Sequence, residues 1–171
     1  ASGKSITLSG NGVYDIGACV ALATGTSLGT DWTGTVRLGN AGSNTTVLSL
    51  ASLGQSGSTV ELVGVEGHVG DGYTVESNLK LTNTANGTSA LRITNGNEDK
   101  TLTINGAVTG SGTFERGGNK GSNQNYVFAG DVQGWTGSFL NSSTQSNREN
   151  VATVTFNGSN IINASIIDSN T

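Results

Sequence analysis

Apolar and polar residues alternate in short segments along most of the chain. A period of two is that of a β-strand, whose successive side chains point to opposite faces of a sheet. No stretch places apolar residues three and four apart over about ten positions, as an amphipathic helix would. The alternating pairs are Ile6 and Leu8, Val20 and Leu22, Val36 and Leu38, Leu48 and Leu50, Val60 and Leu62, Leu79 and Leu81, Leu91 and Ile93, Leu102 and Ile104, Tyr126 and Phe128, and Val154 and Phe156. The pattern predicts an all-β protein.

Clusters rich in Gly, Asn, Asp and Ser separate these segments, for example GNAGSN, NTANGT and RGGNKGSNQN. Such residues supply the backbone conformations that sharp turns need. From position 79 onward, apolar segments begin about every twelve residues, at 79, 91, 102, 114, 126 and 139. A β-sandwich, a β-barrel and a β-solenoid all fit this spacing.

Two features favour the solenoid. The segments TDWTGTV and QGWTGSF hold both tryptophans, Trp32 and Trp135, in one frame, and stacked coils produce such internal repeats. The chain also lacks Pro, as expected where almost every backbone N–H donates to a neighbouring coil. We therefore expect residues 1–171 to form a single β-solenoid segment with about 20 to 25 residues per coil. Its continuous core is expected to contain Ile6, Leu8, Val36, Leu38, Leu91, Ile93, Leu102, Ile104, Tyr126 and Phe128.

The amino-acid composition makes some classes of partner and location unfavourable. Gly accounts for 27 residues, and Lys and Arg number 8 against 12 Asp and Glu, without a basic stripe. Nucleic acid is therefore an unfavourable partner. No stretch approaches the roughly 20 apolar residues of a membrane-spanning helix, so we expect no membrane span in this segment. Cys19 is the single cysteine, which excludes an internal disulfide and favours a small buried thiol.

The segment TLTINGAVTGSGTFERGGNKGSNQNYVFAGDVQGWTGSF, residues 101–139, resembles the autotransporter-associated β-strand repeat of large bacterial surface proteins. TLTI followed by Gly106 is similar to the first strand of that repeat, and GSGTF to its Gly-x-Gly turn with the next apolar residue. Arg116 stands where the family usually has Lys, and YVFAG is similar to the second strand. Trp135 occupies the aromatic-Thr-Gly position. The resemblance covers about a quarter of the chain, with a partial second copy around Thr33.

This resemblance implies a right-handed parallel β-helix in the passenger region of a secreted protein. It further implies a structural or adhesive role without catalysis, at the extracellular or outer-membrane surface of a bacterium. A host or bacterial surface glycan or protein would be the partner, and no catalytic, cofactor-binding or metal-binding residues are expected. The alternative is a polysaccharide-active or glycan-binding β-helix, which needs a groove lined by acids, Arg and exposed aromatic rings.

The repeated Trp-Thr-Gly frame has two interpretations. As a packing feature, each Trp closes a repeat and covers the end of the apolar column. The Gly two positions later then lets the chain turn close to the backbone. As a binding feature, Trp32 and Trp135 would be exposed rings that stack on sugars. Because both tryptophans occupy the same position of a repeated frame, the packing interpretation is favoured.

Catalytic and nucleotide-binding motifs are weak. His68 is the single histidine, in the turn-like stretch EGHVGDG, with Asp71, Ser56 and Ser58 nearby in the sequence. A Gly-rich turn offers neither a rigid mount nor an oxyanion hole, so a solvated loop histidine is expected. Neither GNGVYD nor GSGTFE completes the Gly-x-Gly-x-x-Gly pattern of dinucleotide binding.

Acidic residues are the remaining candidates. Glu61, Glu66, Asp71 and Glu76 follow one another without an intervening Lys or Arg, and stacked turns could assemble some of them as Ca²⁺ ligands. A solvated acidic face is the favoured interpretation. β-Helices that act on acidic polysaccharides cluster several acidic residues with Arg on one face. In this chain Arg92 lies near Asp99 in the sequence, and Asp31 lies near Arg37. Nothing in the sequence shows that these residues converge on one face.

The two ends of the predicted stack also have a physical consequence. The first strand pattern begins close to Ala1, and the last apolar residues lie close to Thr171. Stacked coils expose unpaired backbone groups at each end unless these are capped or continued. We therefore expect uncovered ends and weak, concentration-dependent self-association through them. The apolar residues concerned are Ile161, Ile162, Ile166 and Ile167.

Overall fold

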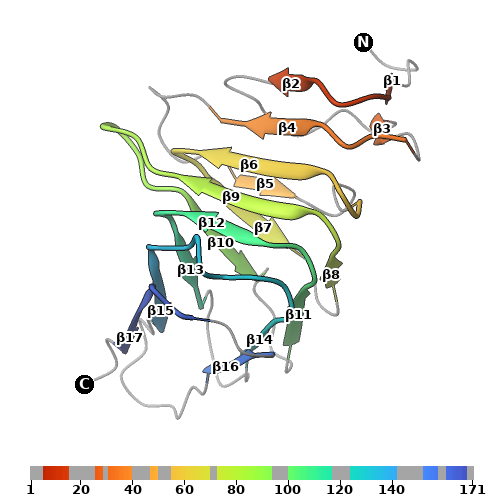
Figure 1. Ribbon diagram of the computed structural model, residues 1–171. Helices are drawn as coiled ribbons and strands as arrows, with labels where there is room; N and C mark the ends of the chain where they lie inside the picture. The colour runs from red at the N-terminus through yellow and green to blue at the C-terminus, as the bar shows by residue number, and fades with distance from the viewer. Residues whose placement is uncertain are drawn as a thin grey trace.

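Parallel strands from successive coils stack into sheets in the computed structural model of the protein (Figure 1). The structure describes residues 6–15, 26–28, 31–39, 47–49, 55–69, 73–93, 100–116, 124–141, 152–157 and 161–168. Within these residues there is no helix, and hence no helix long and apolar enough to cross a membrane. The prediction of an all-β solenoid is confirmed.

Three larger sheets and one short pair make up the stack. The first sheet contains β2 (Val13–Asp15), β4 (Thr35–Leu38), β6 (Thr59–Val63), β9 (Asn78–Thr82) and β12 (Val108–Gly110). The second contains β5 (Val47–Ser49), β7 (Glu66–Val69), β10 (Ala90–Ile93), β13 (Thr113–Glu115), β15 (Ser138–Asn141) and β17 (Ser165–Asp168). The third contains β8 (Tyr73–Val75), β11 (Lys100–Ile104), β14 (Gln124–Phe128) and β16 (Ala152–Phe156), and the short pair is β1 (Ile6–Leu8) with β3 (Thr26–Leu28).

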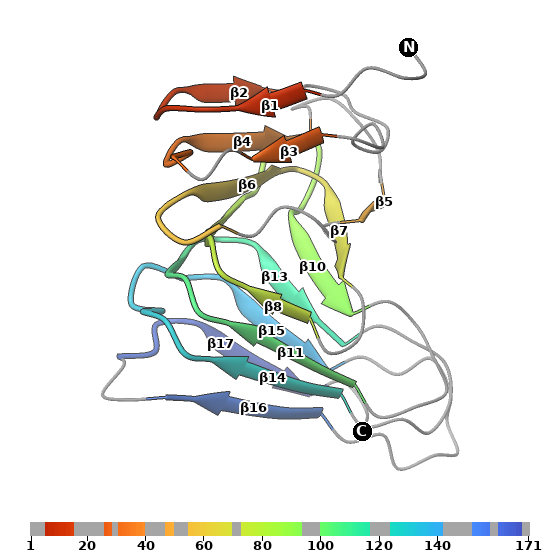
Figure 2. The ribbon, with the colours of Figure 1, turned by 90° about the vertical axis from the view of Figure 1, so that its right-hand side faces the viewer.

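From β6 to β14 the chain visits the three larger sheets in a fixed order. β6, β7 and β8 belong to the first, second and third sheets, and β9, β10 and β11 repeat that order. Figure 2 shows the stack running from β1 and β2 at one end to β16 and β17 at the other. Register partners lie 19 residues apart between Thr59 and Asn78 and 29 apart between Leu79 and Val108. Coils therefore vary in length around the expected 20 to 25 residues.

The core consists of inward-facing columns that continue from coil to coil. In the second sheet, Leu91 pairs in register with Phe114, and Phe114 with Phe139. All three are fully buried, because the residues above, below and across the coil cover them. Eight of the ten predicted core residues are buried, Leu8 packs partly against the core, and the side chain of Ile6 lies outside the described part.

Aromatic rings fill the core towards the C-terminal end. The ring of Phe114 packs edge-on against Trp135 and Phe128, with centroids 5.0 and 4.9 Å apart. Trp135 also stacks on Phe128 at 5.5 Å, and Phe128 on Phe156 at 5.1 Å. Edge-to-face and offset contacts of this kind add stability beyond the burial of apolar area. Trp135 is therefore a central packing residue of this part of the stack.

The Trp-Thr-Gly frame stacks on a Gly-x-Gly turn of the preceding coil. The backbone N–H of Thr136 donates to Gly110 O at 2.9 Å, and Trp135 Nε1 donates to Gly112 O at 2.9 Å. In the other copy, Thr33 N–H donates to Gly10 O at 2.8 Å. Gly10 and Gly110 share a positive φ, at 85° and 94°, which explains glycine at both turns.

The sequence repeat is thus a two-coil unit, Gly-x-Gly below Trp-Thr-Gly. GNGVY and GSGTF, two incomplete nucleotide-binding motifs of which GSGTF also resembles the Gly-x-Gly turn of the β-strand repeat, are its first halves. The two copies do not mark the same corner of the solenoid. The copy at Trp32 leads into β4 of the first sheet, and the copy at Trp135 leads into β15 of the second.

Some expectations about local structure are wrong or fall outside the described residues. The stretch around His68 is not a turn, because residues 66–69 form β7 between β5 and β10. Pairing on both sides favours an extended chain despite the weak strand propensity of Glu-Gly-His. Cys19, Val20 and Leu22 lie outside the described part of the chain.

Candidate functional site: charge ladders and a polar groove

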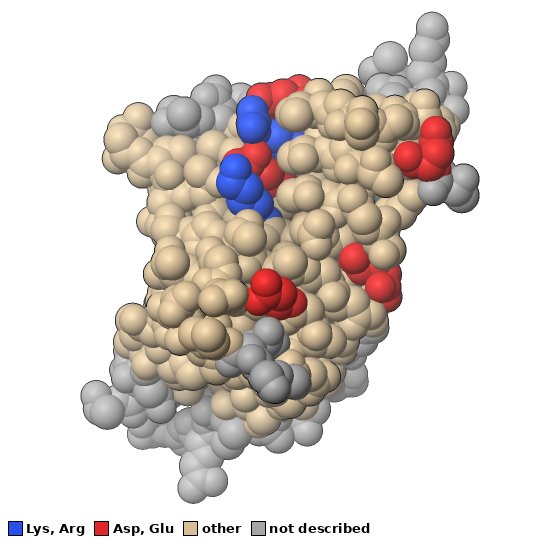
Figure 3. All heavy atoms as spheres, in the orientation of Figure 1, with Lys and Arg blue, Asp and Glu red and all other residues tan. Residues whose placement is uncertain are grey.

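Opposite charges alternate along the outer face of the first sheet. Asp15, Arg37, Glu61 and Lys80 occupy one register position on β2, β4, β6 and β9. Arg37 Nε donates to Glu61 Oε2 at 2.9 Å, and Lys80 Nζ lies 3.1 Å from Glu61 Oε1. Figure 3 shows acidic and basic atoms gathered in one group over these strands. The stacking of coils creates this ladder, since its members are about one coil apart in the sequence.

Glu61 is the buried member of the ladder, with 4% of its surface exposed. Burial alone raises the pKa of a carboxyl group, but hydrogen bonds from Arg37, Thr82 and Lys80 outweigh it. The pKa of Glu61 therefore lies below its ordinary value of 4.5. The hydrogen bond and the negative charge of Glu61, together with Asp15, raise the pKa of Arg37. The ion pair of Arg37 and Glu61 is thus held in its ionised form near neutral pH.

The lowered pKa of Glu61 gives a prediction for acid stability. A carboxyl whose pKa is lower in the folded than in the unfolded state stabilises the fold above its unfolded pKa. This contribution is lost as the pH falls through the folded pKa. We expect Glu61→Gln to lower the free energy of unfolding at pH 7 by about 1 to 2 kcal/mol.

The measurement is urea unfolding at several pH values between neutrality and about pH 3. The wild-type protein should lose more stability than Glu61→Gln across the acid range, so the two curves converge. Glu76→Gln is the control, because Glu76 is exposed and accepts one hydrogen bond, from Asn105. Parallel pH curves for wild type and Glu61→Gln would show that Glu61 is not the linked group.

A second ion cluster lies on the outer face of the second sheet. Arg92 Nη2 on β10 donates to Glu66 Oε2 on β7 and to Glu115 Oε2 on β13, both at 2.8 Å. All three side chains are partly buried. We call Glu66, Arg92 and Glu115 the Glu–Arg–Glu triad. It links three successive coils and fixes the positions of its polar atoms.

A buried tyrosine supports this triad from inside the core. The hydroxyl of Tyr126 donates to the backbone oxygen of Glu115 at 2.8 Å and accepts the N–H of Ile93 at 3.2 Å. Its burial strongly raises the pKa of Tyr126, so the hydroxyl stays protonated. Tyr126 therefore ties together the ends of the two strands that carry Arg92 and Glu115.

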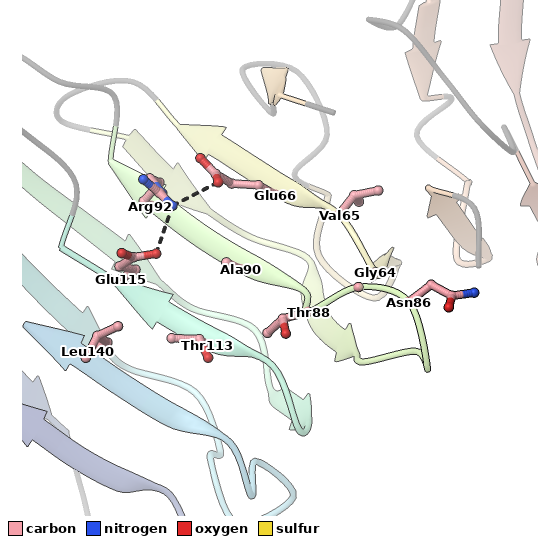
Figure 4. A pocket seen from close by; sticks show the side chains of 11 residues that line it. Gly64, Val65, Glu66, Asn86, Thr88, Ala90, Arg92, Thr113, Glu115 and Leu140 are labelled. Atoms are coloured by element: carbon pink, nitrogen blue, oxygen red, sulfur yellow. Dashed lines mark hydrogen bonds and ion pairs between the residues drawn. The ribbon is translucent and has the colours of Figure 1, made fainter. Parts of the chain in front are cut away.

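The triad forms one end of a hollow of about 390 Å³ on the second sheet (Figure 4). The segment 86–88 and Gly64 line the opposite end, while Ala90 and Thr113 lie between the ends. The hollow exists because Ala90 is small and stands in register between Glu66 and Thr113. We call this hollow the sheet groove.

The structure describes only some of the residues that the sequence analysis considered for a catalytic Ser-His-Asp arrangement. His68 is the register neighbour of Arg92, but its side chain lies outside the described part of the structure, as does Asp71. Ser58 is buried and donates to Gln55 O at 2.7 Å, whereas Ser56 is exposed. The described residues do not assemble a Ser-His-Asp arrangement.

The three described carboxylates of the Ca²⁺ hypothesis have separate partners. Glu61 pairs with Arg37 and Lys80, Glu66 pairs with Arg92, and Glu76 accepts from Asn105 Nδ2 at 2.9 Å. Within the described residues, no group of three or more His, Cys, Asp or Glu side chains could hold a metal ion. Glu61, Glu66 and Glu76 are therefore not brought together.

The sugar-stacking interpretation of the tryptophans is wrong for both rings. Trp32 is 3% exposed and Trp135 is 0% exposed, so neither face is available to a ligand.

Glu66 and Arg92 were named as candidates from the sequence, but their pairing was missed, since Arg92 was considered with Asp99. In the same way, Arg37 of the charge ladder was considered with Asp31. The partners that Arg37 and Arg92 have in the structure lie 22 to 26 residues away along the chain. Opposite charges separated by about one coil were therefore the signal in the sequence that could have predicted these ion pairs.

Comparisons with protein-family models, with curated proteins and with solved structures find nothing that matches this chain. The fold and the geometry of its outer faces are therefore the basis of the functional interpretation.

Proposed function

We propose that this chain is a structural and adhesive segment, without catalytic activity, of a secreted bacterial surface protein of the autotransporter type. The observation that carries the proposal is that side-chain contacts hold neighbouring coils together. The side chain of Trp135, the charge ladder and the Glu–Arg–Glu triad each join neighbouring coils. Such contacts favour a stiff rod that presents its outer faces, and the resemblance of residues 101–139 supports the surface location.

The alternative, a polysaccharide-active enzyme, has one supporting feature. Glu66 and Glu115 are two carboxylates that lie close together in a groove, as glycoside hydrolysis requires. However, Arg92 Nη2 occupies the space between them, where the scissile bond would have to lie. The pair is therefore better suited to hold Arg92 than to transfer a proton.

Two measurements test the proposal. Cells that display the chain on an outer-membrane barrel should adhere more to glycan-coated or protein-coated surfaces than cells that display the barrel alone. The purified chain should release no reducing ends or unsaturated products from neutral or acidic polysaccharides. Release that disappears in Glu115→Gln would establish the enzymatic alternative, and equal adhesion of both cell types would contradict the adhesive role.

We also expect weak self-association through the C-terminal end of the described stack. Ile166 continues the buried column below Phe139, yet 60% of its surface is exposed. Ile161, Ile162 and Ile167 are exposed as well, and uncovered apolar surface of this kind favours association. Sedimentation should show mass rising with concentration, and less so for Ile166→Lys. A monomer at every concentration would contradict this expectation.

A further inference from the structure

The sheet groove has the size and the boundaries of a small-ligand site. Its volume of about 390 Å³ lies in the usual range of ligand pockets, about 300 to 1,000 Å³. It is built on β7, β10 and β13, three paired strands, so its walls keep fixed distances. The Glu–Arg–Glu triad and the hydroxyl of Tyr126 hold one end in place. Sites on rigid elements of this kind lose little entropy on binding.

The lining combines polar ends with apolar patches. The triad offers carboxylate acceptors and guanidinium donors at one end, and Thr88 offers a hydroxyl group at the other. Apolar carbon of Ala90 and Leu140 lies along the groove. A sugar ring has the matching character, because its edge carries hydroxyl groups and its faces carry C–H groups.

The charged residues that line the groove favour one class of sugar over the others. The lining contains two carboxylates and one guanidinium, and that guanidinium is already held between the two carboxylates. A uronate or another acidic sugar would meet a net negative surface and would find Arg92 already engaged. A cationic amino sugar would have to compete with Arg92 for the same two oxygens. An uncharged saccharide can accept from and donate to the triad without separating its ion pairs.

We propose that the sheet groove binds one or two rings of an uncharged saccharide. This inference rests on the proposed adhesive role and names its partner. Binding relies on hydrogen bonds from the triad and from the segment 86–88. No aromatic ring lines the described groove, so the contact with the sugar faces comes from Ala90 and Leu140. Each groove binds weakly, and adhesion results from many copies on one surface.

The test is an NMR titration of the ¹⁵N-labelled chain with separate trisaccharides. The neutral probes are cellotriose, mannotriose and the trimer of N-acetylglucosamine, and the charged probes are trigalacturonate and the trimer of glucosamine. At least one neutral probe should shift the amide signals of residues 86–92 and 113–115. Charged probes should bind at least about tenfold more weakly.

A matched pair of variants tests the location. Ala90→Leu places a larger side chain in the groove, and Thr103→Leu places the same side chain on the outer face of β11, away from it. Binding should weaken at least about tenfold in Ala90→Leu and stay unchanged in Thr103→Leu, while both variants keep the wild-type amide spectrum elsewhere.

Three results would overturn the inference: no shift in the groove with any neutral probe, tighter binding of a charged probe, or full binding by Ala90→Leu. If display of the chain still increases cell adhesion in those cases, only the groove assignment fails. If adhesion is absent while the groove binds a neutral probe, the proposed adhesive role fails instead.

Discussion

Replacing Trp135 by Ala is expected to lower the free energy of unfolding by about 3 to 5 kcal/mol. The ring is fully buried, contacts Phe114 and Phe128, and its Nε1 donates to Gly112 O. The substitution therefore leaves a large cavity and one carbonyl without its indole donor. Thermal or urea unfolding measures the loss, which corresponds to a melting temperature lower by about 10 °C in a domain of this size.

Thr136→Ala is the control for this prediction, because Thr136 lies in the same frame but is exposed. It should change stability by no more than about 0.5 kcal/mol. If Trp135→Ala melts at the wild-type temperature, the ring is not part of the core and the packing of this end of the stack is wrong.

Replacing Gly137 by Ala should destabilise the protein by about 3 kcal/mol or more. An added Cβ would overlap the carbonyl oxygen of Gly112 and lie 2.7 Å from Trp135 Nε1. Neither neighbour can move freely, since Gly112 O belongs to the contact between coils and the ring is enclosed by the core. The same unfolding measurement applies.

Gly12→Ala is the matched control, because a Cβ at Gly12 meets nothing within 4 Å. It is expected to keep wild-type stability or to gain slightly, as Ala restricts the unfolded chain. Equal stability of Gly137→Ala and Gly12→Ala would contradict the close approach of coils at the Trp-Thr-Gly frame.

The core could be predicted from sequence because each coil repeats one local rule. Alternation at Val36 and Leu38 or at Leu102 and Ile104 marks the inward face of a strand, whatever its neighbours are. The burial of both tryptophans followed from their shared frame in the same way. The Gly-x-Gly partner of that frame was missed, because the hydrogen bonds from Thr33 and Thr136 reach a turn in the preceding coil.

The outer faces could not be predicted to the same extent, because their chemistry depends on register. Arg92 meets Glu66 and Glu115 only when three coils of unequal length stack with a defined offset. One residue of slip on a strand would turn these side chains inward. The groove depends in addition on the small side chain of Ala90 between its neighbours, which no local pattern reveals.

The register of the second sheet is the most direct test of the central claim that the chain is a parallel solenoid. Backbone contacts between strands can be measured by nuclear Overhauser spectroscopy on the ¹⁵N,¹³C-labelled protein. The structure predicts contacts between Leu91 and Phe114 and between Phe114 and Phe139, at parallel offsets of 23 and 25 residues. Antiparallel contacts between strands adjacent in the sequence, such as β13 with β14, would contradict it.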